Sequence, residues 1–258
     1  TWMKLAQTYL DAYAAPAGNV WLGADMNALQ LSMGGEKPTS VEVVTLNGAQ
    51  YTKQVYENKN LYFNANGQLS VIEVVKPVVE NALPKALEAY KKAYELDEKH
   101  SKDKDISAGI KTISEKLNQE AYNAYTLGDV KKAEEFFEAA YEAAAQKPYA
   151  QIDTNSLYNA AFTSWSTENF SKAKTMFDKC LGYGYYGDGG EVFAKLSDCV
   201  SHIDTTAAGK VAAKDYLEQG FQKFPTSESI VFGLINYYMT SGEGTDRLYL
   251  DEACTDLS

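Results

Sequence analysis

The sequence contains few of the residues on which most catalytic and metal sites depend. It has two histidines and three cysteines among 258 residues. His100 lies in a charged run and His202 at the expected end of a helix, so neither is paired with a nucleophile or a second ligand. Cys180, Cys199 and Cys254 lack metal-ligand spacing and fall in helical patterns, which predicts small apolar core residues. We therefore expect no catalytic residues, no metal, no cofactor and no enzyme activity.

Positive charge is also scarce. The chain carries 24 basic against 35 acidic residues, a formal net charge of −11. Because phosphate backbones and anionic lipids select basic surfaces, nucleic acid and membrane-surface partners are not expected. No apolar run approaches the roughly 20 residues of a membrane-spanning helix. The chain begins with Thr1 rather than Met, which fits either a removed export signal or a trimmed chain; an exported or periplasmic location is favoured over a cytoplasmic one.

Two polar stretches are interpreted as connections. Residues 182–190, GYGYYGDGG, are rich in glycine but lack the Lys-Ser/Thr of a phosphate-binding loop, so we expect a loop between helices. Residues 97–105 carry mostly charged side chains, which predicts a solvated linker.

What the sequence does contain is a stripe of small and large apolar residues that recurs at helical spacing. Ala133, Phe137, Ala140 and Ala144 are separated by four, three and four residues, which places them on one face of a helix. The same stripe begins again at 86, 173 and 213, as Ala86-Tyr90-Ala93, Ala173-Phe177-Cys180 and Ala213-Leu217-Gly220. The starts at 133, 173 and 213 are evenly spaced along the chain. Self-similarity at such a period predicts a stacked array of repeats.

Each stripe is preceded by a second helical face. These faces are Trp2-Leu5-Ala6-Tyr9, Leu117-Ala121-Tyr125 and Leu157-Ala160-Ala161-Trp165. Small residues let two helices approach to about 8–10 Å. A single pair of helices cannot bury its apolar face, so we expect the pairs to stack.

This pattern resembles the tetratricopeptide repeat (TPR) family, in particular exported bacterial TPR proteins with an N-terminal β insert. The first helix of the family is matched by Trp2-Leu5-Ala6-Tyr9, and the second, in spacing, by Ala213-Leu217-Gly220-Pro225. The resemblance covers roughly residues 1–13 and 84–258. It implies a mainly α fold, an α-α superhelix of about five helical pairs that forms a single solenoid over residues 1–258. The spacing between stripes is longer than the repeat of the family, which is about 34 residues, and another α-solenoid with longer repeats is the alternative.

Residues 14–83 interrupt the first repeat and have a different composition. Runs rich in β-branched and aromatic residues occupy 41–46, 49–56, 61–64 and 68–75, and Asn-Gly pairs at 47–48 and 66–67 are hairpin signals. We expect a small antiparallel sheet of three or four strands, preceded by a short helix over 27–33. The insert is interpreted either as a cap on the solenoid or as a lid or partner-binding platform. The remaining helical repeats occupy 84–258.

In TPR-like stacks the first helices line a concave face that commonly receives a peptide. The resemblance therefore implies a non-enzymatic scaffold that binds a peptide or protein segment. The residues expected on this face are Asn118, Tyr122, Tyr125, Asn155, Tyr158, Phe162, Trp165, Phe232 and Asn236. Aromatic rings offer contact area and amides pair with backbone groups. The alternative is that these rings only pack between repeats.

A carbohydrate-binding or envelope-assembly accessory protein is the second function considered. The chain has 19 Tyr and 3 Trp residues, and Trp21 or Trp165 could stack on a sugar. The last unit is expected to contain a helix over 227–240, a turn at Gly242 and a stripe with Leu250 and Ala253.

Overall fold

The computed structural model describes residues 1–241 of the chain. Ten α-helices and one four-stranded sheet lie within these residues, so the predicted mainly α fold with a small sheet is confirmed. The chain divides into two compact units, Thr1–Ser156 and Leu157–Ser258. Each unit is described by itself.

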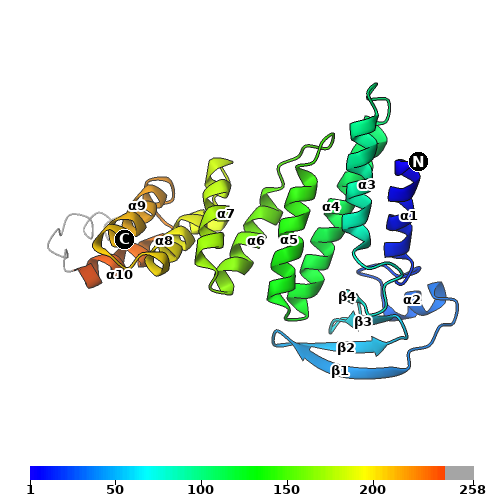
Figure 1. Ribbon diagram of the computed structural model, residues 1–258. Helices are drawn as coiled ribbons and strands as arrows, with labels where there is room; N and C mark the ends of the chain where they lie inside the picture. The colour runs from blue at the N-terminus through cyan, green and yellow to red at the C-terminus, as the bar shows by residue number, and fades with distance from the viewer. Residues whose placement is uncertain (242–258) are drawn as a thin grey trace. The chain divides into compact units, whose positions relative to one another are not determined.

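The helices of the first unit pack in chain order. α1 (Trp2–Ala14) packs against α3 (Ala82–Leu96), α3 against α4 (Asp103–Thr126), and α4 against α5 (Val130–Ala144) (Figure 1). Their shared core includes Ala6, Ala86, Ile110, Leu117 and Ala140. The predicted stripe of α5 is buried, with Ala133 and Ala140 completely covered and Phe137 2% exposed. The helical period thus identified the buried face of α5 correctly.

The long helix α4 begins earlier than the sequence pattern suggested. Residues 97–105 were predicted to be a solvated linker, but only the part before Asp103 is a connection. Asp103 and Asp105 lie in the first turn of α4. Negative side chains are favourable there because the helix N-terminus carries partial positive charge. The linker prediction was therefore wrong for residues 103–105.

The insert forms the predicted antiparallel sheet. β1 (Ser40–Leu46), β2 (Ala49–Val55), β3 (Lys59–Phe63) and β4 (Leu69–Val74) are ordered β1-β2-β3-β4. Asn47 and Gly48 both have positive φ, at 48° and 79°, as a tight hairpin turn requires. The expected short helix is α2 (Met26–Ser32). Leu29 of this helix joins Leu61, Phe63 and Leu69 in a separate small core.

Side-chain amides join the sheet to α4 within the first unit. Asn123 Nδ2 donates to the backbone carbonyl of Ile72 at 3.1 Å. Asn47 Nδ2 donates to the carbonyls of Tyr125 at 3.1 Å and Thr126 at 3.3 Å, which lie in the last turn of α4, where the donors of the helical ladder run out. Figure 1 shows β4 as the strand nearest the helices and β1 as the outer strand. The sheet is therefore held at two points of one helix.

The second unit contains the remaining helices. They are α6 (Thr154–Ser166), which begins just before the boundary, α7 (Phe170–Gly182), α8 (Glu191–Ile203), α9 (Ala207–Lys223) and α10 (Glu228–Ser241). Here α7 packs against α8, and α9 and α10 both pack against α8. The predicted stripes are again buried, with Ala173, Phe177 and Cys180 completely covered and Ala213 and Leu217 nearly so. The helix predicted over residues 227–240 corresponds to α10.

The glycine-rich stretch 182–190 is the connection between α7 and α8, as expected. It closes with the short 3₁₀ turn Asp188–Gly190. Gly190 has a φ of 81° and is buried, and a Cβ at this position would collide with the ring of Phe224. Glycine is therefore required there for both conformation and space.

Cys180 and Cys199 are free and buried, as predicted for core residues. Burial raises the pKa of each thiol to about 12, so both stay protonated at neutral pH. Cys254 and the features expected at Gly242, Leu250 and Ala253 lie outside the described residues. Among residues 1–241, no helix is both long enough and apolar enough to cross a bilayer.

Candidate functional site

Three side chains of α6 face three side chains of α8 in matching order. The Tyr158 hydroxyl donates to Glu191 Oε1. Lys195 Nζ lies 4.8 Å from the centre of the Phe162 ring and 3.9 Å from that of Trp165. Trp165 Nε1 donates to Asp198 Oδ2 at 2.6 Å. We call this set of six residues the α6–α8 ladder.

The spacing of the ladder follows from helical geometry. On α6 the participants occupy positions i, i+4 and i+7, and those on α8 do the same, so each set lies on one face of its helix. Tyr158 and Glu191 are 33 residues apart, as are Trp165 and Asp198. Because residue numbers rise in the same order on both helices, α6 and α8 run parallel where they face each other.

The charged side chains of the ladder are partly buried. Burial lowers the pKa of Lys195, and this effect is opposed by the negative charges of Glu191 and Asp198. A cation placed over two aromatic rings is also attracted by their negative faces. The lysine therefore lies over two rings, with two carboxylates near enough to act on its charge.

Tyr158 also packs against aromatic rings outside the ladder. Its ring contacts those of Phe177 and Tyr185, with centroid distances of 5.9 and 5.5 Å. Burial, followed by the hydrogen bond to Glu191, holds the pKa of the Tyr158 hydroxyl well above its usual range. The hydroxyl thus remains a donor to Glu191 at all ordinary pH values.

The three predicted rings keep a partly exposed side. Tyr158, Phe162 and Trp165 are each half-buried, and all three belong to the ladder. One side of each ring contacts α8, and the remaining surface is open to solvent.

The predicted residues of α10 are more exposed than those of α6. Phe232 is 69% exposed, and Asn236 is exposed as well. Asn236 lines a groove of about 350 Å³ together with Asp198 and Ser201 of α8. Asp198 therefore belongs both to the ladder and to this groove, so the two features are continuous within the second unit.

The other predicted residues belong to the first unit. Asn118 Nδ2 donates to Ser156 Oγ at 2.7 Å. The ring of Tyr122, which is 51% exposed, packs edge-on against Phe137 at 5.1 Å. Tyr125 is 37% exposed and Asn155 is exposed. The structure brings Tyr158, Phe162 and Trp165 together in the ladder, and it places these four residues on α4 and at the start of α6.

Sequence reasoning missed the α8 half of the ladder. Glu191, Lys195 and Asp198 are charged helix residues of a common kind, and none was singled out. The available signal was their constant separation along the chain from Tyr158, Phe162 and Trp165.

The described part of the chain holds no group of three or more His, Cys, Asp or Glu side chains that could bind a metal ion. The ladder contains one tyrosine, two carboxylates and one lysine, and no nucleophile lies beside a base in it. The groups it presents are ring faces, one cation and two carboxylates.

Comparisons with known proteins give no family. No family model matches the chain, and no curated protein matches it either. A chain in the cryo-EM structure of the Sec complex from S. cerevisiae, with the Sec61 pore ring and a Sec63 FN3 double mutant in the class without Sec62, is 16% identical. The alignment covers 72% of this chain and 99% of that chain, with a TM-score of 0.47. A likeness at that level supports no inference about fold or function.

Proposed function

We propose that the protein is a non-enzymatic scaffold that binds an extended peptide or protein segment on the face formed by α6, α8 and α10. The observation that carries the proposal is the α6–α8 ladder, in which two helices present rings and charges in matching order. A bound segment would contact the open sides of Phe162 and Trp165 and the exposed Phe232. Interfaces concentrate their energy in a few aromatic and charged residues of this kind.

We also propose that the helix pairs form a TPR-like superhelix, with the sheet as an insert in its first repeat. Support comes from the buried small residues at the predicted stripe positions. It comes also from the parallel contact of α6 with α8, the arrangement that first helices of successive pairs would have. In such a stack α4, α6, α8 and α10 are first helices. The single solenoid over residues 1–258 remains part of this proposal.

The experiment is a selection from a phage-displayed random peptide library against the full chain, followed by calorimetric titration of the selected peptides. Lys195→Met keeps the aliphatic stem that covers Phe162 and Trp165 but removes the charge. We expect it to weaken a ladder-bound peptide about tenfold, which corresponds to about 1.4 kcal/mol.

Val211→Ala serves as the matched control, because Val211 is 49% exposed on α9 and lies outside the ladder. It should leave the affinity unchanged. Selected peptides that bind Lys195→Met and Phe162→Ala as tightly as the original chain would contradict the proposal, provided that both variants melt near the original temperature.

A further inference from the structure

A second cavity lies within the first unit, between the C-terminal end of α1, the loop before α2, β4 and α4. Its volume is about 430 Å³, which is within the range of small-molecule sites. Val20, Leu22, Ile72 and Val74 contribute apolar walls. The polar side chains that line it from α4 are Glu115, Lys116, Gln119, Glu120 and Asn123. We call this cavity the Trp21 cleft, after the tryptophan that also lines it.

Trp21 carries a large, half-exposed ring on a loop whose backbone is anchored by hydrogen bonds. Its side chain is 51% exposed and makes no hydrogen bond or ring contact with any other residue of the described chain. The loop is anchored to β4, where Gly23 N donates to the carbonyl of Leu69 and Leu69 N to that of Ala24, both at 2.8 Å. Ser32 Oγ also donates to the carbonyl of Asn19 at 3.0 Å. Because the backbone of this loop is already anchored, ligand binding to Trp21 needs little further ordering of the loop.

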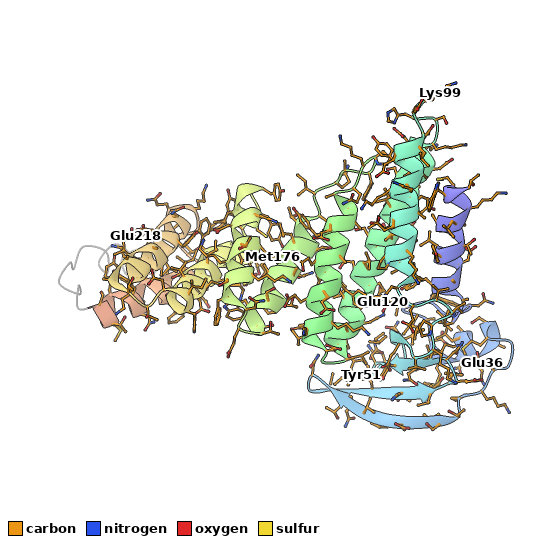
Figure 2. The ribbon with its side chains drawn as sticks, in the orientation of Figure 1. Glu36, Tyr51, Lys99, Glu120, Met176 and Glu218 are labelled. Atoms are coloured by element: carbon orange, nitrogen blue, oxygen red, sulfur yellow. The ribbon has the colours of Figure 1, made fainter. Side chains whose placement is uncertain are left out.

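The opposite wall contains an ordered set of polar groups. The Tyr13 hydroxyl donates to Glu120 Oε1 at 2.6 Å. Gln119 Nε2 donates to Asn123 Oδ1 at 3.2 Å, and Asn123 in turn is fixed to the carbonyl of Ile72. Figure 2 shows Glu120 on the part of α4 closest to the sheet. These contacts hold the carboxylate and both amides in fixed orientations, which leaves the Gln119 carbonyl as an acceptor in the wall.

The charge of the cleft decides which kind of ligand fits. Two carboxylates, Glu115 and Glu120, line it together with Lys116. The positive charges of Lys132 and Lys116 also act on Glu120 and oppose the effect of its burial. Because the charges are nearly balanced, neither a strongly cationic nor an anionic ligand is favoured. The wall offers donors and acceptors in similar measure.

We propose that the Trp21 cleft binds a neutral carbohydrate, with one sugar ring stacked on the indole and its hydroxyl groups bonded to Gln119 and Glu120. A sugar presents an apolar C–H face and a rim of hydroxyls that both donate and accept, so it matches an aromatic plate opposite a mixed polar wall. This site is separate from the α6–α8 ladder and lies in the other unit. The inference therefore stands whether or not the peptide proposal holds.

The test is an array of neutral α- and β-linked oligosaccharides, followed by calorimetric titration of the sugars that bind. Trp21→Ala should weaken binding about tenfold or more, since it removes the stacking surface. Trp2→Ala is the matched control, because Trp2 is similarly exposed, at 43%, in the same unit but outside the cleft. It should leave the affinity unchanged.

The Glu120→Gln variant distinguishes the binding of a neutral sugar from the binding of a cation. The amide retains an acceptor for Tyr13, so a neutral sugar should lose no more than a few-fold in affinity and should bind equally at low and high salt. A diamine such as 1,5-diaminopentane is the competing probe, and it should not bind. The proposal is overturned if no neutral sugar binds at millimolar concentration, if sugar binding survives Trp21→Ala, or if the diamine binds and is lost in Glu120→Gln.

Discussion

At the scale of single residues, side-chain size at the helix contacts is the property most tightly constrained. Ala133, Ala140 and Ala173 are completely buried, and each stands where a larger residue would have to displace a neighbouring helix. Gly109 shows the same limit, because a Cβ there would overlap the ring of Tyr90. The three alanines could be predicted from the sequence, since small residues at intervals of three and four mark the close face of a helix.

Ala173→Leu tests this constraint directly. Because the side chain of Ala173 is completely buried, we expect the larger residue to overpack α7 and to lower the free energy of unfolding by about 1–3 kcal/mol. The measurement is a urea melt. Thr175→Leu on the exposed side of the same helix is the control, and it should change stability by about 0.5 kcal/mol or less. Equal effects of the two substitutions would mean that Ala173 does not lie at a close contact.

Glu120→Gln has a predicted pH dependence. Burial raises the pKa of Glu120 above its unfolded-state value, although the Tyr13 hydrogen bond and nearby lysines oppose this. The folded chain then binds the proton more tightly, so the stability contributed by Glu120 falls as pH rises through the carboxyl range. At neutral pH we expect Glu120→Gln to melt a few degrees higher than the original chain. The difference should shrink in acid, where Glu120 is itself neutral.

Thermal melts over a pH series check this prediction, with Glu115→Gln as the control because Glu115 is exposed and lies next to the cleft. A Glu120→Gln variant that melts lower at neutral pH would show that the hydrogen bonds of the carboxylate outweigh its burial.

At the scale of elements, the β insert has its own small core and is joined to α4 by a few side-chain hydrogen bonds. The hairpins were predictable because Asn47-Gly48 combines turn chemistry with flanking β-branched residues. Their attachment was not, since nothing local in the sequence relates Asn47 to the carbonyls of Tyr125 and Thr126. The early start of α4 was missed because a charged run resembles a linker when its cap and tertiary contacts are unknown.

The Asn47→Gly substitution tests the hydrogen bonds between the β1–β2 turn and α4. Glycine adopts the positive φ of the turn without strain but cannot donate to the helix carbonyls, so we expect a loss of about 1 kcal/mol. Asn66→Gly, in the exposed loop between β3 and β4, is the matched control. Hydrogen exchange should show faster opening of β1 and β2 only in Asn47→Gly. The same protection of both strands in the two variants would contradict a role for these hydrogen bonds.

At the scale of the whole molecule, the sequence predicted the mainly α fold and the small sheet. It also predicted the α6 residues of the α6–α8 ladder. Repeated helical stripes and one β-rich interruption are local signals, and both appear in the structure. The ladder partners Glu191, Lys195 and Asp198 could not be recognised, because charged residues on a helix acquire a role only when another helix faces them. The Trp21 cleft likewise depends on how a loop closes on β4. A long-range contact of this kind leaves no periodic pattern.

The most direct test of the peptide-binding proposal uses the three tryptophans of the chain as reporters. Indole N–H signals in a nitrogen–proton correlation spectrum can be assigned by Trp→Phe variants to Trp2, Trp21 and Trp165. On addition of a selected peptide, we predict a shift of the Trp165 signal, because its indole lies in the α6–α8 ladder and donates to Asp198, while Trp2 and Trp21 stay unchanged. An unchanged Trp165 signal at saturating peptide would contradict the proposal that the ladder is the binding face.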